Sequence, residues 1–195
     1  MSRKRKVTVC PTASEIETEL KREQYRGRYG RVLRSTVYTL IVVAAIAVLV
    51  ATLWMPVFQI YGTSMTPTLS ENNIVVSLKG SAFTFGDIVA FYHGNKLLVK
   101  RVIAGPGQWV DIDDEGNVFV DGELLDEPYI TEKAYGDVNI ELPYQVGDGR
   151  YFVMGDHRLT SADSRNSTIG CISEEQIVGR IVYRVWPFGE FGPIE

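Results

Sequence analysis

The chain has 195 residues, a formal net charge of −4 and a hydrophobic fraction of 45%, which is near that of ordinary globular proteins. A chain of this length holds one modest folded domain and a smaller segment. Two cysteines, Cys10 and Cys171, give no disulfide or metal framework.

The first 34 residues are basic, with ten Lys or Arg against four Glu, whereas the rest holds ten Lys or Arg against twenty acids. A nucleic-acid arm is not expected, because the basic cluster Arg3–Lys6 is short and glutamates interrupt the rest. We predict a loose tail over residues 1–34, with at most a short helix over Ser14–Tyr25 that starts with a capping box of Ser14 and Glu17.

An uncharged segment follows, from Ser35 to Ser70, and within it Val37–Phe58 is almost wholly apolar. At about 1.5 Å per residue, such a helix crosses roughly 30 Å of hydrocarbon. A buried core helix is the alternative, but Leu40–Val50 is apolar on every face. A cleaved secretory signal fits poorly, because the run is long and follows 34 mostly polar residues. We predict a transmembrane anchor helix over residues 35–58.

Charge predicts the orientation of this anchor in the cell membrane. Basic residues next to the helix favour the cytoplasmic side. Those residues are Arg26, Arg28, Arg31 and Arg34. We therefore predict a single-pass protein in the lipid bilayer, with a cytoplasmic N-terminus and an extracytoplasmic domain over residues 59–195. In this topology Cys10 and Cys171 lie on opposite sides of the membrane and do not pair.

The extracytoplasmic part reads as a mostly β, antiparallel domain, because short β-branched and aromatic runs alternate with Gly, Asp, Asn and Pro. Apolar and acidic residues alternate in Trp109–Asp113 and Val118–Gly122 around a glycine-containing turn, which predicts a half-exposed hairpin. Other strands are expected over Ile74–Leu78, Ile88–Tyr92, Leu97–Ile103, Tyr151–Met154 and Ile177–Val185.

Ser64 lies a handful of residues after the predicted anchor, within Gly62–Leu69, so its hydroxyl would work near the lipid headgroups. It is a candidate nucleophile, although a plain turn serine before Pro67 is the alternative. A serine hydroxyl needs a base to take its proton at neutral pH. A base within reach of this hydroxyl would therefore distinguish a nucleophile from a plain turn serine.

Lys100 is the candidate base. Strand alternation places the side chains of Lys100 and Arg101 on opposite faces, so one of them should point inward. Burial lowers the pKa of a lysine by up to about 3 to 5 units from about 10.4, which makes its amine a usable base near neutrality. An ordinary exposed strand lysine is the alternative.

Four motifs in a fixed order give a more specific signal than either residue alone. They are Gly62–Leu69, Gly86–Phe91, Val99–Gly107 and Gly155–Arg165. With them the chain resembles the bacterial type I signal peptidases over residues 36–187, including the acidic hairpin and Leu125–Tyr129. The resemblance implies a mostly β, membrane-anchored serine endopeptidase that removes signal peptides from exported preproteins after an Ala-X-Ala-like site, without a metal or organic cofactor.

The resemblance also implies roles for five side chains. Ser64 is the nucleophile and Lys100 the general base, while Ser161 hydrogen-bonds the lysine. Asp163 and Arg165 form a supporting ion pair, for which the simpler alternative is a surface pair worth under about 1 kcal/mol.

The oxyanion of the transition state needs hydrogen-bond donors. The backbone N–H of Ser64 should supply one. Some family members add a hydroxyl two residues earlier, but Gly62 stands there, and whether Thr63 or another backbone N–H replaces it stays open. Three further departures, Gly105, Gln108 and His157, do not touch the proposed dyad.

Extended substrate should pair with a strand edge, with side pockets near Ile60, Tyr61, Thr63, Met65 and Val99. Other readings remain. His157 or His93 with Asp87, Asp156 or Asp163 would make a Ser-His-Asp site. A self-cleaving Ser-Lys repressor-type protease is disfavoured by the anchor and the lack of a DNA-binding module. A conjugation-type peptidase with one dedicated substrate and a non-catalytic membrane-tethered binding module are further alternatives.

Overall fold

The computed structural model describes residues 12–80 and 82–194, except the side chains of Glu15 and residues 23–28. The chain divides into two units, before and after the boundary at Val50 and Ala51, and each is described by itself. Cys10 and Arg3–Lys6 lie outside the described residues.

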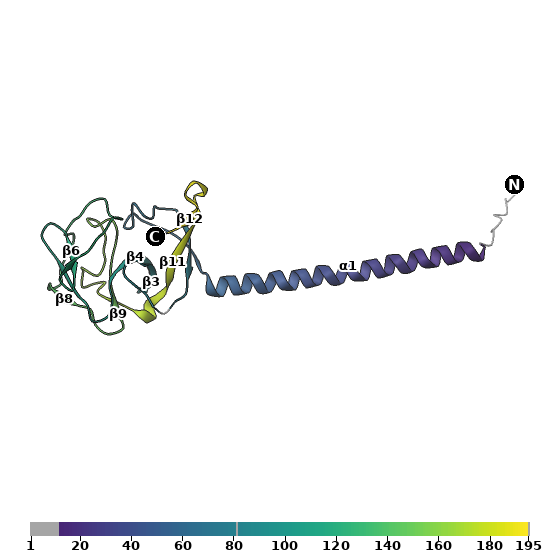
Figure 1. Cartoon of the computed structure of the whole chain (residues 1–195), viewed down its shortest axis with the longest axis horizontal. Helices are drawn as coiled ribbons and strands as arrows, with labels where there is room; N and C mark the ends of the chain where they lie inside the picture. Colours follow the sequence, from purple (N-terminus) through teal and green to yellow (C-terminus); the bar gives the residue numbers. More distant parts are fainter. Residues whose placement is uncertain (1–11, 81, 195) are drawn as a thin grey trace, which may run out of the picture. The chain divides into compact units, whose positions relative to one another are not determined.

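A single long helix, α1 (Ala13–Trp54), carries the apolar run (Figure 1). Its segment Tyr29–Trp54 has 26 residues and is long and apolar enough to cross a membrane. At about 1.5 Å per residue it is roughly 39 Å long. All described side chains of this segment are exposed, so the reading as a buried core helix is wrong.

The start of α1 corrects the prediction for the N-terminal segment. The helix begins one residue before Ser14, near the predicted capping box, but it continues through residue 34 into the apolar run. No proline interrupts Arg26–Arg34. Extending an existing helix costs far less than starting one, so the apolar helix propagates into its polar flank. A short helix that ends at Tyr25, within a loose tail, was therefore a wrong expectation.

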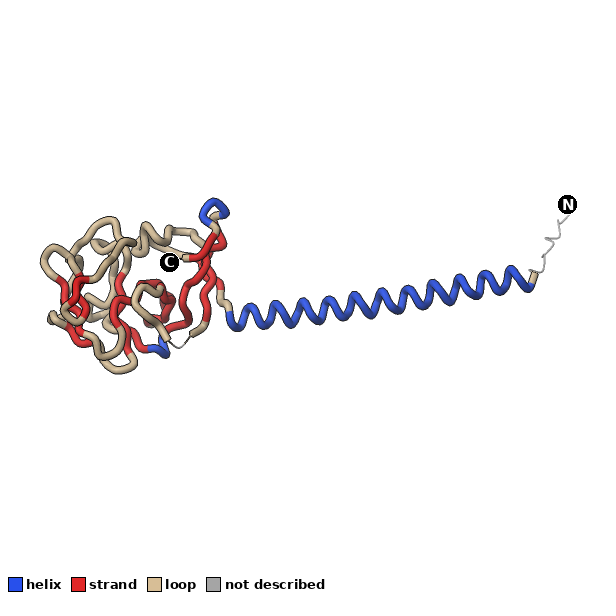
Figure 2. Tube along the Cα trace, viewed as in Figure 1, coloured by secondary structure: helices blue, strands red, loops and turns tan. Residues whose placement is uncertain are grey.

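In the remainder of the chain the regular elements are mainly strands (red in Figure 2), and every strand pairing among the described residues is antiparallel. The larger sheet has eight strands in the order β1-β2-β11-β3-β4-β9-β10, with β12 paired to β11. Its strands are β1 (Val57–Gln59), β2 (Ile74–Leu78), β3 (Ile88–His93), β4 (Lys96–Ala104), β9 (Arg150–Met154), β10 (Ile172–Ser173), β11 (Ile177–Trp186) and β12 (Gly192–Pro193). The 3₁₀ turns η1 (Glu174–Gln176) and η2 (Phe188–Glu190) flank β11.

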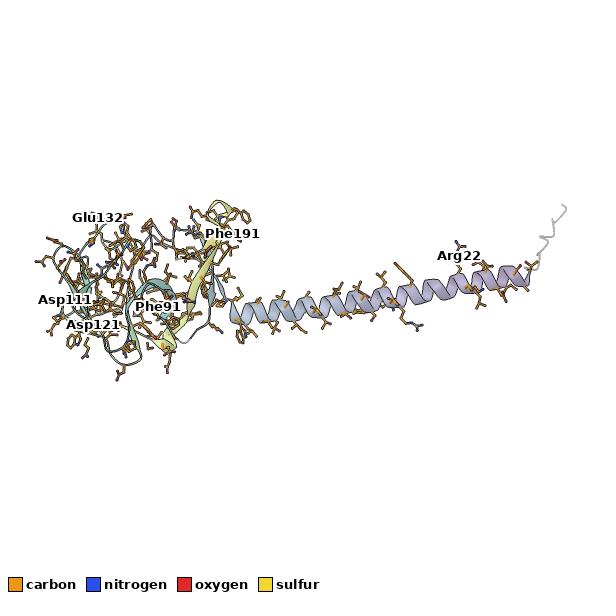
Figure 3. All side chains as sticks on the ribbon, viewed as in Figure 1. Arg22, Phe91, Asp111, Asp121, Glu132 and Phe191 are labelled. Carbon is orange, nitrogen blue, oxygen red and sulfur yellow. The ribbon has the colours of Figure 1, made fainter. Side chains whose placement is uncertain are left out.

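The smaller sheet has four strands in the order β7-β6-β5-β8. They are β5 (Trp109–Ile112), β6 (Val118–Val120), β7 (Glu123–Leu124) and β8 (Tyr144–Gln145). The predicted hairpin is confirmed, because β5 pairs with β6 and its residues alternate between exposed and buried. The exposed Asp111 and Asp121 belong to this hairpin and its following turn (Figure 3).

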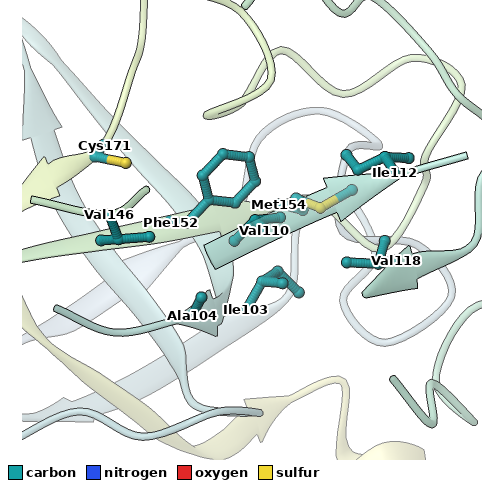
Figure 4. Close-up of a cluster of buried hydrophobic side chains, with 9 residues drawn as sticks. All are labelled: Ile103, Ala104, Val110, Ile112, Val118, Val146, Phe152, Met154 and Cys171. Carbon is teal, nitrogen blue, oxygen red and sulfur yellow. The ribbon is translucent and has the colours of Figure 1, made fainter. Parts of the chain in front are cut away.

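All the predicted strands are present, and the mostly β, antiparallel fold class is confirmed. One core cluster lies where the two sheets meet, around Phe152 and Val110 (Figure 4). Cys171 belongs to this cluster, and burial raises the pKa of its thiol to about 11. The thiol is therefore protonated at neutral pH and serves as a small apolar side chain.

Candidate active site

Ser64 lies in the turn between β1 and β2 and is half-buried. Hydrophobic neighbours fix this turn, because Met65 and Leu69 are fully buried. Its backbone is tied to another part of the chain, since the carbonyl of Ser64 accepts a hydrogen bond from the N–H of His157 at 3.1 Å. Burial and this hydrogen bond hold the candidate nucleophile in place.

Lys100 lies in β4 and is only 3% exposed. Burial lowers the pKa of its amine from 10.5 to about 8. The negative charges of Asp163 and Asp156 raise the pKa in part, and the positive charge of Arg165 lowers it further. None of the ion pairs among the described residues includes Lys100. A substantial fraction of this amine is therefore neutral near pH 8.

Ser64 and Lys100 line the same cleft, which has a volume of about 540 Å³. Its other lining residues are Val57, Phe58, Gln59, Ile60, Tyr61, Gly62, Met65, Lys96, Leu97, Leu98 and Val99. Four of the five predicted pocket residues are among them, whereas Thr63 is not. Within the described part of the chain, no hydrogen bond joins Ser64 Oγ to Lys100 Nζ. Catalytic hydrogen bonds are often long before substrate binds.

Two strand edges border this cleft. Strand β1 pairs only with β2 among the described strands. Strand β9 pairs with β4 only from Arg101 to Ala104, so the part of β4 that lines the cleft, Lys96–Lys100, has no β9 partner. Exposed edges of this kind accept an extended peptide as an added strand.

Ser161 is buried, and its Oγ has no hydrogen-bond partner among the described residues. The hydrogen bond to Lys100 that the resemblance implies is therefore not formed in this structure. Ser161 does lie close to the nucleophile's backbone, because Gly155 contacts both Ser161 and Ser64. A Cβ atom at Gly155 would clash with Ser161 Oγ and would lie 2.5 Å from the Ser64 carbonyl oxygen.

Asp163 and Arg165 form a fully buried ion pair, with Arg165 Nε donating to Asp163 Oδ1 at 2.8 Å. The second carboxylate oxygen accepts from Arg165 Nη2 at 2.9 Å and from the N–H of Gly155 at 3.0 Å. The alternative reading as a surface pair is wrong. The pair instead joins the region of Ser161 to the end of β9.

A second buried ion pair was not predicted from the sequence. Arg101 is 2% exposed and donates from Nε and Nη2 to Asp156 at 3.0 and 2.8 Å. The same carboxylate accepts from Thr68 Oγ1 at 2.5 Å. Because both faces of β4 are covered here, Lys100 and Arg101 are both buried, and the expectation that only one points inward is corrected.

The histidines do not form the alternative Ser-His-Asp site in this structure. Neither His93 nor His157 lines the cleft that contains Ser64 and Lys100. The Nδ1 atom of His157 pairs instead with Thr160 Oγ1 at 2.7 Å.

Comparison with known proteins gives the family. The family model described as "Signal peptidase, peptidase S26" matches residues 33–186. The chain belongs to the signal peptidase family. All five predicted site residues lie inside the matched range.

Relatives of this signal peptidase are bacterial. Signal peptidase IB of Staphylococcus aureus strain COL is 38% identical over 156 residues, which cover 69% of this chain and 79% of the relative. Signal peptidase I U of Bacillus subtilis strain 168 is 32% identical over 170 residues, covering 79% and 88%. A crystal structure of a signal peptidase I from Enterococcus faecalis V583 aligns with a TM-score of 0.44 and 26% identity, and covers 51% of this chain and 96% of that one.

The expected family is thus confirmed as that of the bacterial type I signal peptidases. The chain is a hydrolase, a serine peptidase that cleaves signal peptides from preproteins. This family assignment disfavours the repressor-type protease and the non-catalytic binding module.

Proposed function

We propose that this signal peptidase cleaves exported preproteins after an Ala-X-Ala-like site, with Ser64 as nucleophile and Lys100 as general base. The observation that carries the proposal is that the two side chains line one cleft. It is supported by the burial that lowers the pKa of Lys100 to about 8. Asp163, Arg165 and Ser161 are proposed to support the lysine from the side of β9.

In the first step, the neutral Lys100 amine takes the proton of the Ser64 hydroxyl while Oγ bonds to the scissile carbonyl carbon. The carbon–nitrogen bond then breaks, and the Lys100 ammonium gives its proton to the departing amine of the mature chain. The signal peptide remains as an ester on Ser64. Water attacks this ester with Lys100 again as the base, which releases the signal-peptide carboxylate and restores the serine.

The tetrahedral oxyanion is proposed to bind the backbone N–H of Ser64. Among the described residues this N–H donates to no backbone carbonyl or side chain, so it is available to the oxyanion. One such donor is worth about 2.7 to 4 kcal/mol in the transition state. Residue 62 is a glycine, so no side chain there could supply a second donor.

The preprotein is proposed to add as an extended strand between the edges of β1 and β4. Successive side chains of such a strand point to opposite sides, so alternate residues enter the cleft. Its walls are largely apolar, with Phe58, Ile60 and Leu97 among them. A small apolar residue at alternate positions, as in Ala-X-Ala, matches these walls.

The apolar helix segment Tyr29–Trp54 is proposed to anchor the enzyme in the cell membrane. Arg31 and Arg34 lie at its N-terminal end, which favours a cytoplasmic N-terminus and an extracytoplasmic peptidase unit. A preprotein whose signal peptide lies in the same bilayer would then meet the site at a raised local concentration. The bilayer and the preprotein are the proposed partners.

The test is cleavage of a preprotein with an Ala-X-Ala site by the purified full chain in detergent, with the product identified by mass spectrometry. Cleavage after the second alanine is expected, and it should be lost in Ser64→Ala and Lys100→Ala. The exposed Ser167 gives a matched control, since Ser167→Ala should cleave normally. Normal cleavage by either dyad variant, with a native circular dichroism spectrum, would refute the assignment.

A further inference from the structure

Residues 126–136, here called the strap, have no role in the steps described above. The strap lies between β7 and β8 and contains no helix or strand. It contacts the segment 155–165, here called the 155–165 loop, which carries Ser161, Asp163 and Arg165. The contacts involve buried charges, so they hold the loop firmly.

Glu127 is the first contact. Its carboxylate is buried and accepts hydrogen bonds from both terminal nitrogens of Arg158, from Nη1 at 2.9 Å. Tyr129 Oη donates to the same carboxylate at 2.9 Å. The Nε of Arg158 donates to the carbonyl of Gly155 at 3.1 Å. The strap therefore fixes the start of the 155–165 loop through a bidentate pair, a strong and directional kind of contact.

The ring of Tyr129 is the second contact. It lies against the guanidinium of Arg101, whose Cζ is 3.9 Å from the ring centroid. This guanidinium binds Asp156 of the 155–165 loop and also donates from Nη2 to Thr68 Oγ1 at 3.3 Å. Thr68 follows Ser64 by four residues. The tyrosine thus covers the group that joins the nucleophile's segment to the loop.

The far end of the strap is the third contact. Arg165 Nη1 donates to the carbonyls of Ala134 and Tyr135 at 3.2 and 2.8 Å. A Cβ atom at Gly136 would lie 2.5 Å from Arg165 Nη1 and 2.8 Å from the carbonyl oxygen of Arg158. The strap backbone therefore packs directly on the loop, and Gly136, at φ +71°, allows this close approach.

We propose that the strap is a positioning element for signal-peptide cleavage, in which Glu127 and Tyr129 hold the 155–165 loop and Arg101 in place around the amine of Lys100. The inference rests on the proposed Ser64–Lys100 dyad. Neither strap residue touches the cleft, so both act through their partners.

The charges that act on Lys100 support this inference. They are Asp163, Arg165 and Asp156. Arg165 is held by the strap carbonyls, and Asp163 is held by Arg165. Asp156 is held by Arg101, on which Tyr129 lies. Loosening the strap would therefore disturb every one of these charges and admit water toward the lysine.

The test is Tyr129→Leu in the full-length enzyme, with Tyr144→Leu as the matched control. Both tyrosines are half-buried, but Tyr144 packs on Phe152 in the core cluster where the two sheets meet, away from Arg101. A displacement of about 1 Å at a reacting group costs about 100-fold in rate. For Tyr129→Leu we expect kcat to fall by about that factor, with KM within about twofold. Water that reaches Lys100 favours its charged form and raises its pKa, so the acid limb of the pH profile should move up by about one pH unit. Tyr144→Leu should lower the melting temperature and leave the limb in place.

A second pair of variants separates positioning from folding and applies even where Tyr129→Leu does not fold. Glu127→Gln keeps the shape and removes the charge that binds Arg158, so it should lower kcat and move the limb in the same direction. Glu127→Asp keeps the charge and should restore part of both. Destabilisation without a move of the limb in Tyr129→Leu and Glu127→Gln would overturn the inference. Failure of the dyad itself would look different, because wild-type enzyme would then lack a limb that depends on Lys100.

Discussion

The lowered pKa of Lys100 leads to a quantitative prediction for the pH dependence of cleavage. With a pKa of about 8, the amine is about one-tenth neutral at pH 7, against about 0.03% for a lysine at 10.5. Only the neutral amine can accept the proton of Ser64. We therefore expect kcat/KM to rise about tenfold per pH unit up to pH 8 and to level off above it, because each unit changes the neutral fraction tenfold.

The same burial affects stability with a definite sign. Between pH 8 and 10.5 the unfolded chain binds more protons at Lys100 than the folded chain, so the free energy of unfolding rises with pH across that window. The full difference is roughly 3 kcal/mol and is a constant penalty below pH 8. Lys100→Met should remove the penalty, so it should be more stable than wild type at pH 7 and lose that advantage by pH 10.

The assay is steady-state cleavage of a fluorogenic signal-peptide substrate from pH 6 to 10, with thermal unfolding of the same samples followed by fluorescence. The exposed Lys79 gives a matched control, because Lys79→Ala should keep the same limb. A profile that is flat from pH 6 to 9, or a limb with a midpoint near 6.5 as for a histidine, would refute the assignment of Lys100 as the base.

Three further predictions follow from buried contacts. Gly155→Ala forces a methyl group against the Ser64 carbonyl and should abolish cleavage at a stability cost of about 1 to 3 kcal/mol. Gly179 is similarly crowded, so Gly179→Ala should lose stability but keep kcat. Cleavage kinetics and melting curves separate the two outcomes. Asp163→Asn removes a charge that raises the pKa of Lys100, so the acid limb should move below pH 8, and an upward move would contradict the electrostatic account. Phe152→Ala should cost about 3 to 5 kcal/mol in denaturant unfolding, and a loss under about 1 kcal/mol would show that this core is not packed as described.

Local patterns in the sequence were enough for most of the fold. Alternating apolar and acidic residues predicted the hairpin of β5 and β6, and β-branched runs predicted β2, β3, β4, β9 and β11. The short strands β1, β7, β8, β10 and β12 were missed, because two or three residues carry no periodicity. The extension of α1 through residue 34 was also missed, since helix propagation depends on the neighbouring apolar helix and not on the polar segment itself.

In the active site, too, some features could be predicted from the sequence and others could not. Motif order brought Ser64, Lys100 and Ser161 to attention, but the sequence could not show that Arg101 is buried along with its neighbour. Its partner Asp156 is 55 residues away, and Glu127 and Arg158 are 31 residues apart. Such pairings depend on tertiary packing and leave no periodic signal, so only the structure revealed them.

The most direct test of the account is the capture of the covalent intermediate. An activated ester of an Ala-X-Ala peptide would be mixed with the enzyme, quenched in acid within one turnover, and the protein digested for mass spectrometry. We predict the acyl group on Ser64 in wild type and no detectable adduct at pH 7 in Lys100→Ala. An adduct on another residue, or equal labelling of Ser64 without Lys100, would contradict the Ser-Lys mechanism.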